Sequence, residues 1–417
     1  MDQNTVTNRK RLPALVSLSA GLALTALCSV WPQASFAETQ WYAVGMNVLA
    51  THSDGKFGPG SNCPKGGNGE WVHEQISILK WRYGYTDEKA KQVLLEENNY
   101  QGGGGRRSLI GERGIKDGKP ASIYFYPTSI PLHPDEIVVP HGRGYGFDLD
   151  GTAASRPDSL IDPETGEYVQ NNLFRILGCY SLYNINLPAR PTDEESNYVT
   201  GLAVVPPLLI GVTGNDLSKD GPITITMGKP LQHALLGADG RPLRGQTYTL
   251  DPSVQNFGTL QGKIVNGEIK AAGGQMVWMG ETPLLTPLDL TNTHIRLKAN
   301  PDGSLGGYLG GFQPWMDYWF QEAVAESFFG VDISAMYYYC EALAEADPDP
   351  VTGKNRRISA TYRLDDVMPV YVLPAPDNYR APVNLRSQNR QLITRYQQGW
   401  GESNANYPKM VAAGDKQ

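Results

Sequence analysis

Hydrophobic and polar positions alternate with a period of two in the central part of the chain, between residues 195 and 312. In 223–227, isoleucine and methionine alternate with threonine, and in 294–299 apolar residues alternate with His294, Arg296 and Lys298. This alternation is typical of antiparallel strands that bury one face and leave the other in water. The sequence therefore predicts an antiparallel sandwich or a barrel-like sheet for this region.

An Asn-Gly pair marks the sharpest turn of this region. Asn266 and Gly267 lie between the strand-like flanks that end at Val265 and begin at Glu268. Asn-Gly suits both central positions of a type I′ turn, which need positive φ angles. We therefore expect a two-residue hairpin here.

The period changes to that of helices after residue 312. Trp315, Trp319 and Phe328 lie near one face of a helix predicted over 315–328, and Asp332 is the expected N-cap of a second helix. Strands are predicted again over 358–362 and 367–373. We expect an α+β fold that is rich in β-structure, with this short helix pair packed on the central sheet.

Five regions follow from these patterns. A helix over 87–97 with Thr86 as its N-cap and a short strand over 123–126 are predicted in the N-terminal part. The many glycines (46) and prolines (30) predict frequent turns. The regions are a signal peptide over 1–37, a mixed loop-rich region over 38–190 that includes an acidic loop, an antiparallel β region over 195–312, the helix pair and closing strands over 313–375, and a polar tail over 376–417.

The first 37 residues have the order of a secretory signal peptide. Three basic residues at 9–11 precede an apolar stretch from Leu15 to about Trp31, and Ser35 and Ala37 supply the small residues of a cleavage site. A retained anchor is disfavoured because the stretch is short and ends at Pro32. Lipidation of Cys28 is disfavoured because a bulky leucine precedes it. We expect a periplasmic or secreted protein with no transmembrane segment after cleavage.

Export changes the expectations for charge and for cysteines. Cleavage removes one acidic and three basic residues and lowers the formal net charge from -7 to -9. An acidic protein lacks the basic surface that nucleic acid needs, so nucleic acid is excluded as a main partner and an unknown small molecule, glycan or protein remains. Cys63, Cys179 and Cys340 survive cleavage, and an oxidising compartment predicts one disulfide among them, with the pairing left open.

The string Phe147-Asp-Leu-Asp-Gly-Thr152 resembles the first motif of the haloacid-dehalogenase family of phosphatases. In that family the first aspartate is the nucleophile and the second is the general acid, which would be Asp148 and Asp150 here. The motif needs a buried parallel strand before the first aspartate, and such a strand is a continuous run of apolar residues. Residues 141–147 contain three glycines and do not form such a run. It also needs a helix after the loop, which Pro157 and Pro163 interrupt.

A calcium-binding loop is a second interpretation of the same stretch. Flexible acidic loops supply the six to eight oxygen ligands that Ca²⁺ takes, although the EF-hand template is not met because Gly146 and Pro157 occupy its first and last ligand positions. The alternative is a solvated acidic loop with turns at its Asp-Gly and Thr-Gly pairs. The candidate metal ligands are Asp148, Asp150, Asp158, Asp162 and Glu164.

Other catalytic signatures are missing from the sequence. The six histidines include no His-Glu-x-x-His pair, so a zinc hydrolase lacks its usual motif. No Gly-x-Ser-x-Gly elbow occurs, which leaves a lipase-type triad without a nucleophile. We therefore assign no catalytic and no cofactor-binding residue.

Four longer phrases stand out in the chain: 145–151, 173–179, 310–315, and 347–353 running into 358–363. Together they are similar to an uncharacterised family of exported bacterial proteins. The resemblance implies no activity, and it places the Asp-x-Asp-Gly within a long loop that leads to a cysteine. From all of this we expect a non-enzymatic exported binding or structural protein with a Ca²⁺-stabilised loop, and the alternative is a metal-dependent hydrolase that uses Asp148 and Asp150.

Overall fold

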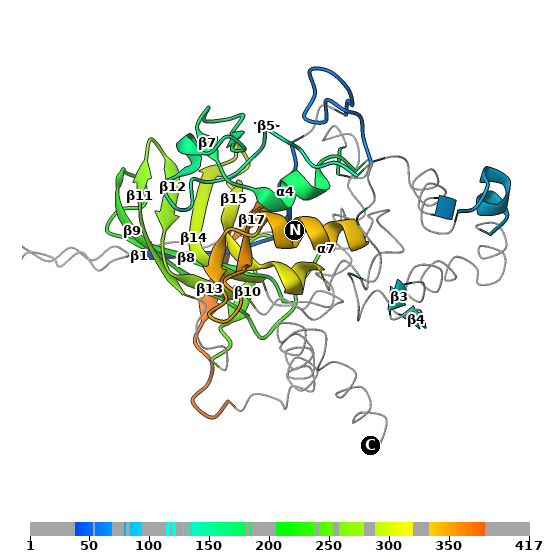
Figure 1. Ribbon diagram of the computed structural model, residues 1–417. Helices are drawn as coiled ribbons and strands as arrows, with labels where there is room; N and C mark the ends of the chain where they lie inside the picture. The colour runs from blue at the N-terminus through cyan, green and yellow to red at the C-terminus, as the bar shows by residue number, and fades with distance from the viewer. Residues whose placement is uncertain are drawn as a thin grey trace, which may run out of the picture. The chain divides into compact units, whose positions relative to one another are not determined.

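The structure of the chain is a computed structural model (Figure 1). All described residues belong to one compact unit, Ala37–Gln417. The predicted signal peptide, the strand over 123–126 and the tail beyond residue 379 lie outside the described residues. The structure describes residues 38–52, 55–68, 79–80, 84–93, 114–116, 119–121, 128, 132, 136–180, 183–184, 206–238, 242–252, 258–278, 288–319 and 333–379.

Eight antiparallel strands form a closed barrel, which confirms the β-rich, barrel-like fold (Figure 1). Each strand pairs with the next in space, and the first strand also pairs with the last, which closes the ring. Two of these strands, the first and the last along the chain, come from outside the region 195–312. In spatial order the strands are β1 (Glu38–Ala43), β8 (Leu209–Gly214), β9 (Gly221–Gly228), β11 (Thr259–Val265), β12 (Glu268–Ala272), β14 (Leu288–Ala299), β15 (Leu305–Pro314) and β17 (Asn355–Leu373).

Apolar side chains from all eight strands fill the interior of the barrel. The predicted alternation holds, because Ile223, Ile225 and Met227 on β9 and Ile295 and Leu297 on β14 are all buried in one cluster. The predicted hairpin joins β11 to β12, with positive φ angles of 53° at Asn266 and 73° at Gly267. Local sequence pattern and turn chemistry therefore agree with the observed strands in this part of the barrel.

Additional short strands extend the barrel wall. Three pair with β17 and one pairs with β14, and two small sheets are not hydrogen-bonded to the barrel strands. The strands are β2 (Met46–Leu49), β10 (Thr247–Thr249) and β16 (Ala346–Pro348) on β17, β13 (Gln275–Trp278) on β14, the pair β3 (Gly114–Lys116) and β4 (Lys119–Ala121), and the trio β5 (Gly142–Arg143), β6 (Leu160–Ile161) and β7 (Tyr168–Val169).

Helical segments pack together beside one stretch of β17. Helices α4 (Asn172–Leu177) and α7 (Ile333–Leu343) share a buried cluster with Ile358 of β17 and with the helical residues 315–319. The ring of Tyr337 on α7 meets those of Trp315 and Trp319 edge-on, each with centroids 5.3 Å apart. This contact confirms the predicted helix pair as far as the structure describes it. Residues 320–332 lie outside the description.

Two further predictions have mixed outcomes. Residues 87–93 are helical, and the hydroxyl of Thr86 accepts a hydrogen bond from the Lys89 amide, as an N-cap does. The two strands predicted over 358–362 and 367–373 are one strand, β17. It carries one extra residue opposite β15, because Leu305 faces Val367 whereas Gly307 faces Leu364.

No helix within the described residues is long and apolar enough to cross a membrane.

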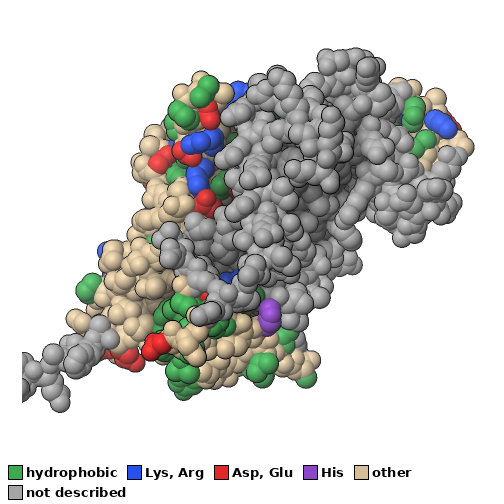
Figure 2. Space-filling view, turned by 90° about the horizontal axis from the view of Figure 1, so that it is seen from below, with side chains coloured by type: hydrophobic (Ala, Val, Ile, Leu, Met, Phe, Trp, Pro, Cys, Tyr) green, Lys and Arg blue, Asp and Glu red, His purple; other side chains and the backbone are tan. Residues whose placement is uncertain are grey.

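The surface carries both charged and hydrophobic side chains, and hydrophobic ones gather on part of the face shown in Figure 2. Leu235, Leu243, Tyr371 and Leu373 are among the most exposed large hydrophobic side chains of the described residues, between 45 and 68% exposed. They lie around β10 and the end of β17. Tyr248 of β10 itself is buried against Val370, so this part of the wall has a packed inner side and an apolar outer side.

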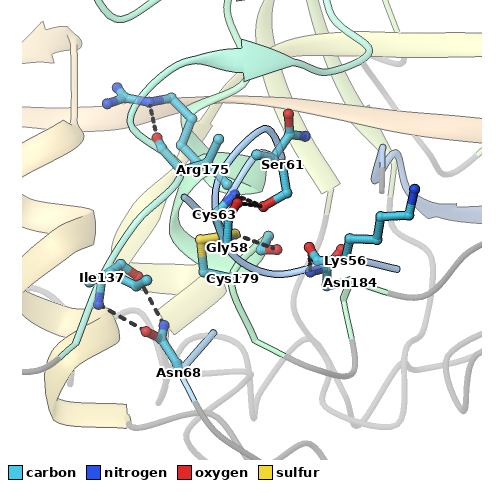
Figure 3. The surroundings of a disulfide bond; sticks show 12 residues. Lys56, Gly58, Ser61, Cys63, Asn68, Ile137, Arg175, Cys179 and Asn184 are labelled. Carbon is cyan, nitrogen blue, oxygen red and sulfur yellow. Dashed lines mark hydrogen bonds between the residues drawn. A yellow bond between two sulfur atoms is a disulfide. The ribbon is translucent and has the colours of Figure 1, made fainter. Parts of the chain in front are cut away.

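A disulfide joins Cys63 to Cys179, which resolves the pairing that spacing left open (Figure 3). It ties the segment before residue 68 to the residues just after α4, in a small buried cluster with Val139, Leu160 and Phe174. The Asn68 side chain reinforces this connection, because its amide donates to the Ile137 carbonyl and accepts from the Ile137 amide, both at 2.9 Å. Cys340 is buried in the helix cluster and is not part of this disulfide.

Replacing both Cys63 and Cys179 by serine is expected to lower the free energy of unfolding by about 2–5 kcal/mol, because the bridge closes a long loop in the unfolded chain. The bridged residues are 116 positions apart. Urea unfolding of the oxidised parent and of the double variant measures the difference. The parent treated with reductant is the control and should match the variant; equal stability of the oxidised parent and the variant would contradict the expectation.

Candidate functional site

The acidic loop (145–164) packs on the outer wall of the barrel, over β14 and β15. The ring of Phe147 lies 2.6 Å from the point that a β-carbon on Gly310 would occupy, so only glycine fits at that position of β15. Tyr145 stacks on Tyr308 of β15 with ring centroids 4.7 Å apart and planes 20° apart. The side-chain amide of Asn292 on β14 donates to the Leu149 carbonyl. The loop is thus a second layer on the barrel wall.

The Asp-x-Asp-Gly string forms a turn that begins the short 3₁₀ helix η2 (Ala153–Ser155). Asp148 accepts a hydrogen bond from the Ala153 amide at 3.0 Å. Asp150 accepts from the amide and the hydroxyl of Thr152, at 3.0 and 2.6 Å. Phe147, before the first aspartate, makes an isolated antiparallel bridge with Gln170. Asp148 therefore does not follow a buried parallel strand, which is the context that the phosphatase motif requires.

Asp150 belongs to a cluster that links the loop to the segment after α7. Arg156 donates to Asp150 at 2.6 Å and also to Glu345, whose side chain is only 8% exposed. The Gln170 amide donates to both carboxylates, at 3.3 Å to Asp150 and 3.1 Å to Glu345. Burial acts to raise the pKa of Asp150, but hydrogen bonds from Thr152 and the charge of Arg156 outweigh it and the pKa is lowered.

Asp162 and Glu164 form a second cluster around Arg296 of β14. Asp162 is fully buried and accepts from the Arg296 guanidinium at 3.2 Å and from the amides of Glu164 and Thr165 at 2.9 and 3.0 Å. Glu164 accepts from the same guanidinium at 3.3 Å. A buried carboxylate keeps its charge only when cations and donors replace its water. Arg296 is therefore the centre of this cluster.

Tyr308 completes the Arg296 cluster. Its hydroxyl donates to Glu164 at 2.8 Å, and the Arg296 guanidinium lies 5.1 Å above its ring centroid. Burial raises the pKa of Tyr308, and the bond to Glu164 raises it further, because a neutral hydroxyl is the form that can donate. Tyr308 remains protonated and acts as a fixed donor on the barrel wall.

Asp158 forms a third ion pair, with Arg175 of α4. The guanidinium donates to Asp158 at 2.5 Å and to the Val139 carbonyl at 3.0 Å, while the arginine side chain itself is buried (Figure 3 shows the second contact). The pair joins the loop to the helix that carries Cys179 at its end. Through it the loop and the disulfide region become one packed unit.

The five predicted metal ligands are thus distributed over separate environments. Among the described residues, no group of three or more histidine, cysteine, aspartate or glutamate side chains could hold a metal ion. Asp162 and Glu164 come together, but they do so around an arginine. Calcium binding by Asp148, Asp150, Asp158, Asp162 and Glu164 stays a prediction.

Sequence reasoning missed the residues that organise this site. Arg156, Arg175 and Arg296 are the cations that engage the carboxylates, and Glu345 joins from a distant segment. No pattern in the sequence marks Arg296, because its place on the polar face of a predicted strand assigns it to solvent. No pattern marks Glu345 either.

Comparison with protein-family models, with curated proteins and with solved structures finds no match to this chain.

Replacing Arg296 by methionine is expected to lower the free energy of unfolding by about 3–5 kcal/mol, because Asp162 would keep a buried charge without its cation. The matched control is Arg244→Met, which removes an ion pair to Asp302 in which both side chains are about half exposed. That loss should stay below about 1 kcal/mol. Urea unfolding at neutral pH measures both, and equal effects of the two substitutions would contradict the expectation.

His294 should make the free energy of unfolding depend on pH. Burial lowers its pKa and Asp148 offsets this only in part. The unfolded chain, with a histidine pKa of about 6.5, binds more protons just below that value, so stability falls as the pH drops through it.

We expect His294→Gln to reduce the loss of unfolding free energy between about pH 6.5 and pH 5, with the exposed His233→Gln as control. Both variants should still lose unfolding free energy near pH 4 and below. In the folded chain the pKa of Asp150 is lowered, so its carboxylate is protonated, and its stabilising charge lost, only in that range. Denaturant unfolding across this pH range measures both windows. A profile for His294→Gln that coincides with the parent would contradict the assignment.

Proposed function

We propose that this chain is an exported binding or structural protein whose ligand binds to the outside of the barrel. The observation that carries the proposal is the filled interior. Seven of the eight barrel strands contribute buried apolar side chains to one cluster, and the partly buried Tyr42 of β1 packs against it. An eight-stranded barrel is at the size where the interior either is filled by side chains or holds one small ligand. Filling by side chains favours an external binding surface.

The disulfide supports the expected compartment. Cys63 and Cys179 form a buried bridge, and such bridges form and persist in oxidising environments. Together with the signal-peptide pattern of residues 1–37, this favours the periplasm or the outside of the cell.

The acidic loop fits a structural role in this proposal. Asp150, Asp158 and Asp162 each accept from an arginine side chain, and Asp148 and Asp150 also hold the turn before η2. A carboxylate that serves as nucleophile or general acid has to face a substrate, whereas these face the protein's own donors. The loop therefore stabilises one wall of the barrel and the segments connected to it.

The test is an assay of the purified mature protein on a generic phosphate ester with Mg²⁺, paired with thermal melts in Ca²⁺ and in chelator. We expect no Mg²⁺-dependent turnover above that of a boiled sample. Turnover that Asp148→Asn abolishes, while the exposed Asp302→Asn does not, would overturn the proposal and establish the hydrolase. The melts test the calcium prediction separately, because an ion that binds only the folded chain must raise the melting temperature.

A further inference from the structure

Four exposed apolar side chains lie on neighbouring segments around β10, and we name them the β10 patch: Leu235, Leu243, Tyr371 and Leu373. Tyr371 and Leu373 lie two residues apart on β17 and face Thr247 and Thr249 of β10 across a parallel ladder. The Tyr371 ring reaches to 4.0 Å from the β-carbon position of Gly245, and the nearby Leu243 amide donates to the Leu235 carbonyl at 2.9 Å.

The backbone beneath the β10 patch is rigidly held. The Gln246 side chain donates to the carbonyls of Leu235 and Leu243 and accepts from the Leu235 amide, at distances of 2.7–3.0 Å. The apolar side chains are therefore exposed on a fixed surface, with Leu235 and Tyr371 more than 60% exposed. Exposed apolar side chains that gather on one part of a surface favour an interaction there.

The chain itself leaves the barrel at this surface. Leu373 ends β17, and the described residues end six positions later at Tyr379. A further 38 residues, 380–417, follow Tyr379 in the sequence. This segment is therefore tethered close to the β10 patch. Even the twelve positions from Leu373 to Leu385 span at most about 40 Å when extended. Any segment tethered this closely has a high effective concentration at the patch.

The sequence that follows has an apolar stripe at helical spacing. On a helix these residues would occupy an arc of about 100°, which is the width of an apolar face that packs on a surface. The remaining positions of 385–400 are mostly glutamine, arginine, asparagine, serine and threonine. The stripe consists of Leu385, Leu392, Ile393, Tyr396 and Trp400.

Charge favours the same pairing. Residues 380–417 contain six basic and two acidic residues, a net charge of +4, whereas the rest of the mature chain carries -13. Asp251 and Asp377 lie close to the patch residues in the sequence, whereas the cation next to Leu243, Arg244, is already paired with Asp302. A basic segment is attracted to such a surface and is steered toward it.

We propose that the β10 patch is the docking surface of the chain's own segment 385–400, which binds there as an amphipathic helix through its apolar stripe. The segment covers an apolar surface that would otherwise face other proteins. The proposal is independent of the external ligand proposed above.

Cross-linking of the full mature chain tests the proposal. Thr247→Cys places a thiol at the exposed position opposite Tyr371, and Asn389→Cys places one within the stripe without removing an apolar residue. A short bis-maleimide then joins the two thiols when they are close. The measured quantity is the yield of the intramolecular link in this parent and in two further variants, with melting temperatures checked for all three.

The two variants separate apolar docking from simple tethering. Leu392→Asp with Ile393→Asp disrupts the stripe, whereas Gln391→Asp with Gln398→Asp adds the same charges to the polar face. We expect the first pair to lower the yield on the order of tenfold, since burial of two large aliphatic side chains is lost. The second pair should keep the yield within about twofold of the parent, because its charges stay in water.

Three results would overturn the proposal. Equal yields in all three proteins would mean that the tether alone brings the thiols together. Equal losses in both variants would mean that charge and not the apolar stripe holds the segment. A link that forms only between two chains would mean that a second copy occupies the patch.

Discussion

The pairing of the first strand with the last is the constraint on which the rest of the structure depends. Trp41 of β1 faces Gly211 of β8 on one side and Val370 of β17 on the other. Without β1 the barrel would be an open sheet with two long unpaired edges, and its apolar interior would face water along the gap. Closure provides hydrogen-bond partners for the backbone N–H and C=O groups along both edges, and it also excludes water from the interior.

The second layer of the structure follows from the outer wall of that barrel. A closed sheet also has an outer face. On β14 this face carries Arg296, at a position that the alternation of apolar and polar residues assigns to solvent. The acidic loop covers it, and the buried arginine then requires carboxylates, which Asp162 and Glu164 provide. Arg156 and Arg175 repeat this arrangement at Glu345 and Asp158. The charge balance of the loop is therefore internal, and the loop, α4 and the disulfide region pack as one layer.

Sequence reasoning succeeded where the physics is local. Alternation over 223–227 and 294–299 and the Asn266-Gly267 turn depend only on neighbours along the chain, and the structure confirms them. The single strand β17 was predicted as two, because Asp365 and Asp366 interrupt its apolar pattern. The structure accommodates them with an extra residue and a φ of 50° at Asp366. The partners of Asp162 could not be predicted, since Arg296 lies 134 positions away and only the fold brings them together.

The position of β1 also sets the order of events when the chain folds. Its partner β17 is the last strand of the barrel along the chain, so the ring can close only after every other strand has been synthesised. Contacts between residues so distant in sequence make folding slow, and an open sheet exposes its edges during the delay. The strand that begins directly after the predicted cleavage site is the one whose pairing completes the fold.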